Sequence, residues 1–363
     1  MGGFAECFAD LQDPRTGNAT RHLLLEVLMI ALCAMLCGAE GCVDMAAFGK
    51  AKQSFLKRFL TLPNGIPSHD TFSRIFRFLD PEQFGQCFQA FVRRFAEAHH
   101  GVIAVDGKTL RRSFDRASAG SPLHMVSAWG GEQRLVLGQI AVDAKSNEIT
   151  AVPKLLAMLS LDGCIVTADA LNCQRDTAER IIDQGGDYVL ALKGNQATLF
   201  DDVKTFLDDP QATVSAATEV DAGHGRIEHR TAAVSTDIGW LQEHHGWPGL
   251  KAIGKVTASR ETNGKTTRQS RYYLLSATLS AERFNSVVRE HWGIENCLHW
   301  VLDVVMNEDQ ARNRKGNGPN NLAVLRHMAL NIIKADTSKG SNRGKFKRAG
   351  WNDDFLAKLL AQI

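Results

Sequence analysis

The sequence has few of the features that mark secreted, membrane-embedded or zinc-ribbon proteins. Its eight cysteines include no Cys-x-x-Cys pair, which predicts buried thiols in a reducing compartment and argues against a cysteine zinc site. The most apolar stretch, residues 23–36, is too short to span a bilayer, and the start of the chain lacks signal-peptide flanks. No internal repeat is visible. We therefore expect a cytoplasmic protein that makes no membrane contact.

The charge is almost balanced as a total but uneven along the chain. Lysine and arginine number 42 against 40 aspartate and glutamate, for a formal charge of +2 at pH 7. Residues 312–363 are strongly basic, and their acids are Asp336, Asp353 and Asp354. Such a segment is suited to lie along nucleic-acid phosphates. A solvated basic tail without a partner is an equally open alternative.

Residues 1–98 predict an all-helical N-terminal domain. Apolar residues recur at helical spacing up to residue 36 and again over residues 43–60. A further helix is expected to begin at Asp80-Pro81 and to run to about residue 98.

A short helix is expected directly after Ser68, its predicted N-cap. Its polar positions are His69, Ser73, Arg74 and Arg77. Because a tight turn and another helix precede it, a helix-turn-helix DNA reader is one interpretation. A small helical bundle without DNA contact is the other.

From residue 99 the pattern changes from helices to strands. Strand patterns occupy residues 102–105, 123–129, 134–142, 164–167 and 188–192, and helices are expected at 150–161 and 175–184. Short links join the first three strands, which predicts antiparallel pairing, whereas helical crossovers make the others parallel. This order excludes a doubly wound nucleotide-binding fold. It predicts an α/β protein with a mixed sheet of the ribonuclease H (retroviral integrase-like) kind.

A second β-rich part is expected over about residues 213–278. Its strand patterns lie at residues 226–234, 250–259 and 268–276, and Asn263-Gly264 marks one of the turns between them. We interpret this part as an insertion, not as a continuation of the core sheet.

The C-terminal part predicts helices and a tail. A helix is expected at residues 320–334, a flexible segment at 337–350 and a short helix at 353–362. We therefore divide the chain into a helical domain at 1–98, a sheet domain with its insertion at 99–335, and a basic tail at 336–363.

The helix predicted over residues 281–307 carries a carboxylate among apolar side chains. Ser280 is its expected N-cap. At 100° per residue, Glu295 falls on the same arc as Phe284 and Leu298. A carboxylate on a core-facing stripe is costly unless a positive group meets it. Two interpretations remain: a buried ion pair, or a metal-binding or catalytic acid.

Two further acids are expected near Glu295. Asp106 follows the first predicted strand and Asp169 follows the fourth, and these strands are neighbours in the predicted topology. Three converging carboxylates repel one another unless divalent cations intervene, and hard oxygen ligands suit Mg²⁺ or Mn²⁺. Two such ions ~4 Å apart can activate an attacking oxygen and stabilise a leaving one in phosphodiester chemistry.

Four blocks of sequence carry a family resemblance. They are Ala104-Val105-Asp106-Gly107-Lys108, Thr167-Ala168-Asp169-Ala170-Leu171, Tyr188-Val189-Leu190-Ala191-Leu192-Lys193-Gly194-Asn195-Gln196, and His291-Trp292-Gly293-Ile294-Glu295-Asn296 followed by Leu302-Asp303-Val304. Together they resemble the DDE transposases of bacterial insertion sequences, most closely the ISAs-type, H-repeat-associated family. The resemblance covers almost the whole chain and includes an associated N-terminal domain.

The resemblance implies a function and a site. Asp106, Asp169 and Glu295 would be the catalytic, metal-binding acids, with two Mg²⁺ or Mn²⁺ ions. The activity implied is metal-dependent cleavage of DNA at element ends and strand transfer into target DNA. The implied partners are double-stranded DNA (terminal inverted repeats and target) and a second copy of the chain, in the bacterial cytoplasm or on its nucleoid.

The sequence departs from related families at the Glu295 helix. Several of them place an arginine four residues before the glutamate and a lysine seven residues after it, where this chain has His291 and Leu302. Other groups are then needed to contact DNA phosphates. The candidates are Lys108, Lys193, Asn195, His291, Arg312 and Arg314, with Arg289 as a further one.

Three other interpretations remain open. A nuclease of the same fold would cut DNA without strand transfer, and an inactive descendant of a transposase would only bind DNA. His291, Glu295 and His299, at i, i+4 and i+8, would form a zinc site in the third. The simpler alternative to a zinc site is that both histidines hydrogen-bond within the fold or to phosphate.

Overall fold

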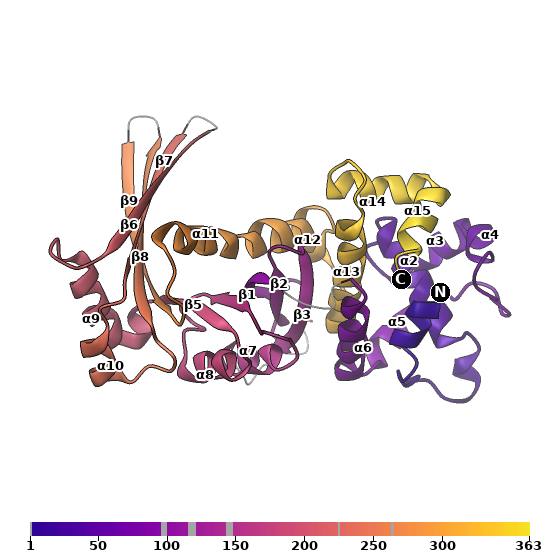
Figure 1. The fold of residues 1–363 in the computed structure, drawn as a ribbon. Helices are drawn as coiled ribbons and strands as arrows, with labels where there is room; N and C mark the ends of the chain where they lie inside the picture. Colours follow the sequence, from indigo (N-terminus) through magenta and orange to yellow (C-terminus); the bar gives the residue numbers. More distant parts are fainter. Residues whose placement is uncertain (1, 96–99, 115–120, 143–147, 224–225, 263–264) are drawn as a thin grey trace.

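The computed structural model describes residues 2–95, 100–114, 121–142, 148–223, 226–262 and 265–363. One mixed sheet of nine strands runs through the molecule in the order β3-β2-β1-β4-β5-β9-β8-β7-β6. An all-helical region lies at one end, and the outer strands extend from the other (Figure 1). The predicted combination of a mixed α/β part and a helical N-terminal region is thus confirmed.

The core of the sheet has the predicted strand order. β1 (Gly101–Thr109), β2 (His124–Gly130) and β3 (Leu135–Val142) form an antiparallel meander, and β4 (Cys164–Ala168) and β5 (Asp187–Leu192) follow β1 in parallel. The crossover helices are α7 (Glu148–Leu156) and α8 (Arg175–Asp183). The strands at the centre are apolar because helices cover the sheet.

β1 is longer than the sequence pattern predicted. Pairing with β2 continues to Thr109, so Asp106 lies inside the strand, opposite Ser127, and not after its end. The apolar run ends before Asp106, the first charged residue of the strand. The strand itself continues, because cross-strand hydrogen bonds join backbone groups whatever the side chains are.

The predicted insertion continues the core sheet, and our interpretation of it as a separate piece is wrong. β9 (Lys265–Leu275) pairs antiparallel with β5, with Val189 opposite Leu275. Without β9, β5 would be an edge strand with unpaired backbone groups. β8 (Ala252–Thr262), β7 (Arg226–Ser235) and β6 (Ser215–Gly223) follow outward, while α9 (Ala197–Asp208) and α10 (Gly239–His245) lie at the base (Figure 1).

β6 was not predicted from the sequence. Its residues, Ser-Ala-Ala-Thr-Glu-Val-Asp-Ala-Gly, have little intrinsic preference for strands. The strand forms because every one of its residues has a partner on β7. The turn expected at Asn263-Gly264 lies outside the described residues.

The helix predicted over residues 281–307 is interrupted. α11 (Ala281–His291) begins at Ser280, whose side chain accepts from the Arg283 backbone N–H, as expected. A π-helical segment (Ile294–His299) then precedes α12 (Trp300–Val304). Ile294, Leu298 and Leu302 of the predicted arc are buried, but Glu295, which the projection places among them, is exposed.

The helical region consists of α1 (Gly2–Cys7), α2 (Leu24–Leu36), α3 (Cys42–Ala51), α4 (Gln53–Leu56), α5 (His69–Phe78) and α6 (Pro81–Arg93). Ser68 and Asp80 cap α5 and α6, which confirms both predicted starts. α2 is buried along nearly its whole length, at the centre of this region. α6 ends at Arg93 and so is shorter than predicted, whereas the predicted domain boundary near residue 98 lies outside the described residues.

α13 (Gly318–Ala335) joins the helical region to the sheet. It packs against α2, α5 and α6 on one side and against β3 on the other. Asn331 hydrogen-bonds both backbone groups of Val136 on β3, while Asn321 donates to the carbonyls of Phe76 and Leu79 at the C-terminal end of α5. None of the helices in the described parts of the chain is long and apolar enough to cross a membrane.

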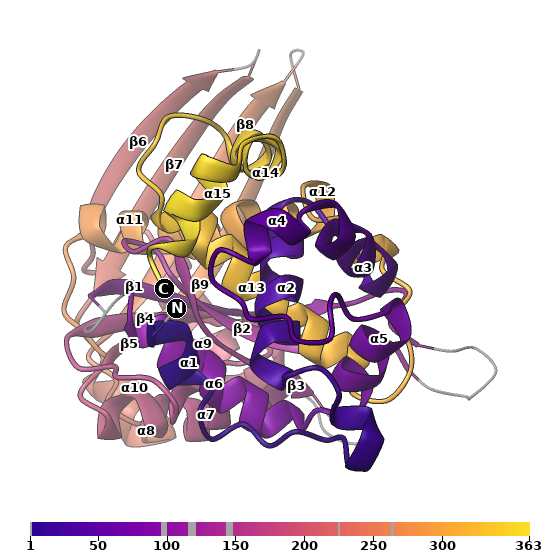
Figure 2. The ribbon, with the colours of Figure 1, turned by 90° about the vertical axis from the view of Figure 1, so that its right-hand side faces the viewer.

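The C-terminal residues are folded, and the flexible segment expected at residues 337–350 is mostly a helix. α14 (Asn342–Trp351) and α15 (Asp353–Leu360) lie over the helical region (Figure 2). Phe346 is buried between polar neighbours, and Asp336 forms ion pairs with Lys345 and Lys358. Because this segment is mostly polar, the sequence pattern does not indicate the few apolar residues that pack it against the rest of the protein.

This packing predicts a measurable loss of stability on truncating a buried residue of α15. Leu356 is fully buried, so Leu356→Ala should lower the free energy of unfolding by roughly 2–5 kcal/mol. Urea denaturation of the whole chain measures the change. Lys347→Ala, an exposed position of α14, is the control and should be nearly neutral. A neutral Leu356→Ala would mean that α15 does not pack as described.

Candidate active site

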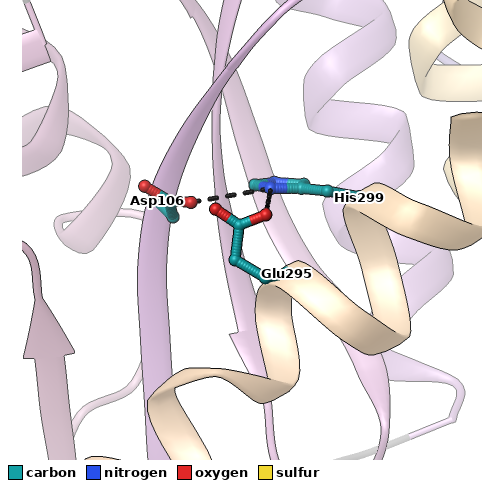
Figure 3. Close-up of side chains that lie close together, drawn as sticks. All are labelled: Asp106, Glu295 and His299. Carbon is teal, nitrogen blue, oxygen red and sulfur yellow. Dashed lines mark ion pairs between the residues drawn. The ribbon is translucent and has the colours of Figure 1, made fainter. Parts of the chain in front are cut away.

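Three polar side chains converge where β1 meets the π-helical segment (Figure 3). Asp106 comes from β1, and Glu295 and His299 come from the π-helical segment. One possible ligand atom of each lies within 4.8 Å of the others. His299 Nδ1 is 3.5 Å from Asp106 Oδ2 and 3.5 Å from Glu295 Oε2. An imidazole nitrogen thus lies between two carboxylates.

The two carboxyl groups differ in environment. Burial, and then the charge of Glu295, raise the pKa of Asp106 to about 8, and Asp169 acts in the same direction. The Glu295 side chain is half exposed. A nearby cation would favour the ionised form of both carboxyl groups and so would stabilise this site. Two carboxylates and an imidazole are a donor set that can hold a divalent cation.

Asp169 is the first residue after β4, the strand next to β1, and it lies outside the ligand cluster of Asp106, Glu295 and His299. Val105 is in parallel register with Ala168, so the residues that follow, Asp106 and Asp169, lie next to each other. Asp169 Oδ1 accepts hydrogen bonds from the backbone N–H and the side-chain Nδ2 of Asn172, at 3.2 and 2.9 Å. The predicted adjacency of the two strands is therefore confirmed, while the roles of the three acids remain a proposal.

The two histidines near Glu295 have different surroundings. His299 is buried, and burial lowers its pKa, although Glu295 opposes the shift. His291 also has a pKa lowered by burial, and its Nδ1 lies 2.9 Å from Thr167 Oγ1 on β4. Within the described residues, the ligand cluster that contains His299 includes Asp106 and leaves His291 out. The i, i+4, i+8 set is therefore not assembled.

Lys108, a predicted phosphate contact, is engaged inside the protein. Its Nζ lies 2.8 Å from Asp303 Oδ1, 3.0 Å from Glu308 Oε2 and 3.4 Å from Asp309 Oδ1. Burial disfavours its charge, but Glu308 and Asp303 more than offset this effect and raise the pKa of Lys108. Because its charge is already compensated, the geometry does not favour contact with DNA.

The other predicted contacts lie on loops around the sheet. Lys193 and Arg312 are exposed. Arg314 is also exposed, and its Nε donates to the Arg112 carbonyl at 3.1 Å. Asn195 Nδ2 donates to the carbonyl of Ala170 at 2.7 Å and so ties the loop after β5 to the residue that follows Asp169. Asn195 thus has a structural bond close to the acids.

A groove with a volume of about 400 Å³ lies between α11 and strands β6–β9 and reaches Asn296, the residue after Glu295. Four arginines line it: Arg230, Arg260, Arg271 and Arg289. Glu228 pairs with the first two and Glu219 with the last, whereas Arg271 lies 4.9 Å from the ring centroid of Trp292.

Sequence reasoning missed Arg271 and Trp292 as site residues. The signal for Trp292 was present, because this large aromatic residue occupies the His-Trp-Gly-Ile-Glu block and yet is 40% exposed. No local signal marks Arg271, which reaches the groove because β9 joins the core sheet.

The raised pKa of Asp106 predicts a pH-dependent stability in cation-free protein. The folded state binds more protons than the unfolded state between the pKa values of about 3.8 and about 8, so unfolding free energy contributed by this group falls as pH rises over that range. Asp106→Asn removes the fall. The variant should therefore gain stability relative to wild type on going from pH 5 to pH 8.

Urea denaturation in EDTA at both pH values measures this difference. Glu179→Gln, at an exposed position of α8, is the control and should keep the pH dependence of wild type. Equal pH dependence in Asp106→Asn and wild type would contradict the electrostatic description of the site.

Comparison with known proteins reveals the family. Residues 5–92 match the family described as DDE_Tnp_1-associated, and residues 97–332 match the transposase DDE domain. The "H repeat-associated putative transposase YhhI" of Escherichia coli (strain K12) is 39% identical over 97% of this chain and 96% of its own.

Two other relatives differ in coverage. The "Putative transposase YncI" of Escherichia coli O157:H7 is 36% identical over 97% of this chain and 92% of its own. The "Inactive transposase YbfQ" of Escherichia coli (strain K12) is 43% identical over 15% of this chain and 64% of its own. The chain therefore belongs to the DDE transposase family and, by its relatives, to the H repeat-associated group.

Proposed function

We propose that this protein is an insertion-sequence transposase that cuts DNA at the ends of its element and joins the freed 3′ end to target DNA. The observation that carries the proposal is the convergence of Asp106 and Glu295, with Asp169 directly after the adjacent strand, in a DDE-family chain. The antiparallel β1–β3 meander followed by parallel β4 and β5 supports a ribonuclease H-like fold.

Asp106, Asp169 and Glu295 would hold Mg²⁺ or Mn²⁺ in this site. When bound, such ions activate the attacking oxygen and stabilise the leaving oxygen of a phosphodiester. Asp106 loses its proton when it becomes a ligand, because a neighbouring positive charge lowers its pKa. Glu295 is on a π-helical turn that leaves it exposed, within reach of a phosphodiester. His299 Nδ1 lies 3.5 Å from an oxygen of each of Asp106 and Glu295 and would be a further possible ligand.

The groove beside Glu295 suits a DNA strand. Besides its arginines, its lining includes Glu219, Asp221 and Glu228, which pair with the other arginines, so Arg271, which forms no ion pair within the described residues, is the arginine available to a phosphate. Trp292 presents an aromatic face on which an unpaired base can stack. The exposed cations Lys193, Arg312 and Arg314 are further candidates for phosphate contact, and a second copy of the chain in the DNA complex is part of the proposal.

Neutralising any of the acids should abolish catalysis while leaving the fold intact. Asp106→Asn, Asp169→Asn and Glu295→Gln should not cut DNA that carries the inverted repeats expected beside the gene, because each removes a charge that would bind the cation. Gel assays of end cleavage and of joining to a plasmid measure both steps, with circular dichroism as the test of folding. Glu179→Gln is the control and should retain full activity.

The same assays separate the alternatives. Full cleavage by Asp169→Asn would refute the assignment of the acids. Wild-type protein that cuts but never joins would be a nuclease, and one that binds without cutting would be an inactive descendant. Elemental analysis alongside a Mg²⁺ titration tests the ion: one zinc per chain, lost in His299→Ala, would overturn the choice of Mg²⁺ or Mn²⁺.

Two substitutions in the groove should weaken DNA binding in different ways. Arg271→Ala removes a phosphate contact and should reduce the slope of log affinity against log salt by about 0.9. Trp292→Ala removes a stacking surface, so it should cost roughly 1–3 kcal/mol of binding with little change in slope. Fluorescence anisotropy at several salt concentrations measures both.

Trp351→Ala is the matched control for the groove. This tryptophan is 78% exposed but lies on α14, away from the groove. Wild-type affinity in both groove variants would show that DNA does not occupy this surface.

A further inference from the structure

A chain of hydrogen-bonded side chains leads away from Asp169. Asn172 is fully buried, and its Nδ2 lies 2.9 Å from Asp169 Oδ1 and 3.1 Å from Glu148 Oε2. Glu148 is the first residue of α7, and its Oε1 lies 2.7 Å from His124 Nε2 on β2. His124 Nδ1 is in turn 2.8 Å from Thr109 Oγ1 on β1. Side chains from β1, β2 and α7 are thus connected to Asp169 through Asn172.

The directions of these hydrogen bonds are determined by the chemistry of the partners. Both neighbours of the Asn172 side chain are carboxylates, which accept when ionised, so the amide must present its NH₂ group to them. Glu148 stays ionised because the hydrogen bond from His124 lowers its pKa in spite of burial. With its second amide hydrogen held by Glu148, Asn172 cannot turn away from Asp169.

This arrangement leaves the two oxygens of Asp169 unequal. Oδ1 accepts from the side chain and the backbone N–H of Asn172. No hydrogen bond within the described residues reaches Oδ2. A carboxylate that is held by one oxygen has a defined orientation and a second oxygen free to bind a cation.

Gly107 shows independently how closely the chain of hydrogen bonds packs against the site. A Cβ at this position would lie 2.3 Å from His124 Nε2 and 2.6 Å from Glu148 Cδ. A larger residue after Asp106 would therefore displace the His124–Glu148 pair. The pair borders the backbone next to Asp106 and, through Asn172, holds Asp169.

We propose that Glu148 and Asn172 are positioning residues that orient Asp169 so that Oδ2 is available to a divalent cation. This inference rests on the proposed function, because it takes the acids to be metal ligands. Partners of this kind, which hold the ligands of a metal, commonly change metal affinity by about 10–100-fold when they are lost.

Mn²⁺ binding to the full-length protein without DNA tests the proposal. The free Mn²⁺ signal in electron paramagnetic resonance reports the Kd, with no dependence on catalysis. Glu148→Ala and Asn172→Ala should each raise the Kd by about 10–100-fold. Glu148→Gln should restore most of the affinity, because its carbonyl can accept from Asn172 while its NH₂ donates to the other tautomer of His124. Glu179→Ala, an exposed glutamate of α8, is the matched control.

A double-substitution cycle distinguishes positioning from a general loss of structure. If Glu148 acts through Asp169, Glu148→Ala should cause little further loss of Mn²⁺ affinity in the Asp169→Asn protein. Glu148→Asp keeps the charge but shortens the side chain, and it provides a second variant should Glu148→Ala fail to fold. It should also raise the Kd.

Three results would overturn the inference: unchanged Mn²⁺ affinity in folded Glu148→Asp and Asn172→Ala proteins, additive losses in the cycle, or no rescue by Glu148→Gln. A failure of the proposed function looks different. Wild-type protein that binds Mn²⁺ and cuts no DNA would refute the proposed activity, whereas the affinity comparison would still decide the positioning role.

Discussion

The structure depends on holding carboxyl groups close together against their mutual repulsion. Asp106 is largely buried and faces Glu295, and the consequence is a pKa near 8 in the absence of a cation. Flexible loops would relieve such repulsion by moving apart. Here Asp106 is within a paired strand, and Glu295 is held in a helical segment with buried residues on either side, Ile294 and Leu298. The rigidity of these elements maintains a site that favours positive charge.

Buried ion pairs hold the Glu295 segment to the sheet. Lys108, two residues after Asp106, binds Asp303 of α12 and Glu308, while Glu308 also faces Arg326 of α13 at 3.5 Å. Buried pairs of this kind contribute less to stability than to a unique arrangement, because desolvation offsets much of their attraction. Through them β1, α12 and α13 keep one relative position, which defines the distance between Asp106 and Glu295.

The groove depends on the pairing of the outer strands with the core sheet. Because β9 pairs with β5, the four outer strands extend from the core sheet as one surface (Figure 1), and α11 packs against β6 and β7 as well as against β1 and β4 of the core. Arg271 on β9 therefore meets Trp292 at the end of α11. The cation–π contact joins an outer strand to the residue block that carries Glu295.

The sequence by itself predicted the strand order of the core and several helix starts. These are local properties: Ser68, Asp80 and Ser280 cap helices in the structure as their positions predict, and apolar runs mark β1, β4 and β5. Since short links and helical crossovers restrict topology, the adjacency of Asp106 and Asp169 could also be predicted.

Only the tertiary structure decided the rest. The π-helical turn at Glu295, the pairing of β5 with β9, the folding of α14 and the enclosure of Lys108 all depend on contacts between residues far apart in the chain. Local sequence propensity cannot predict such contacts, because the energy of a backbone or charged group depends on the groups that surround it in the fold. For the same reason the sequence does not predict that Glu148 and Asn172 lie beside Asp169, where the fold places them.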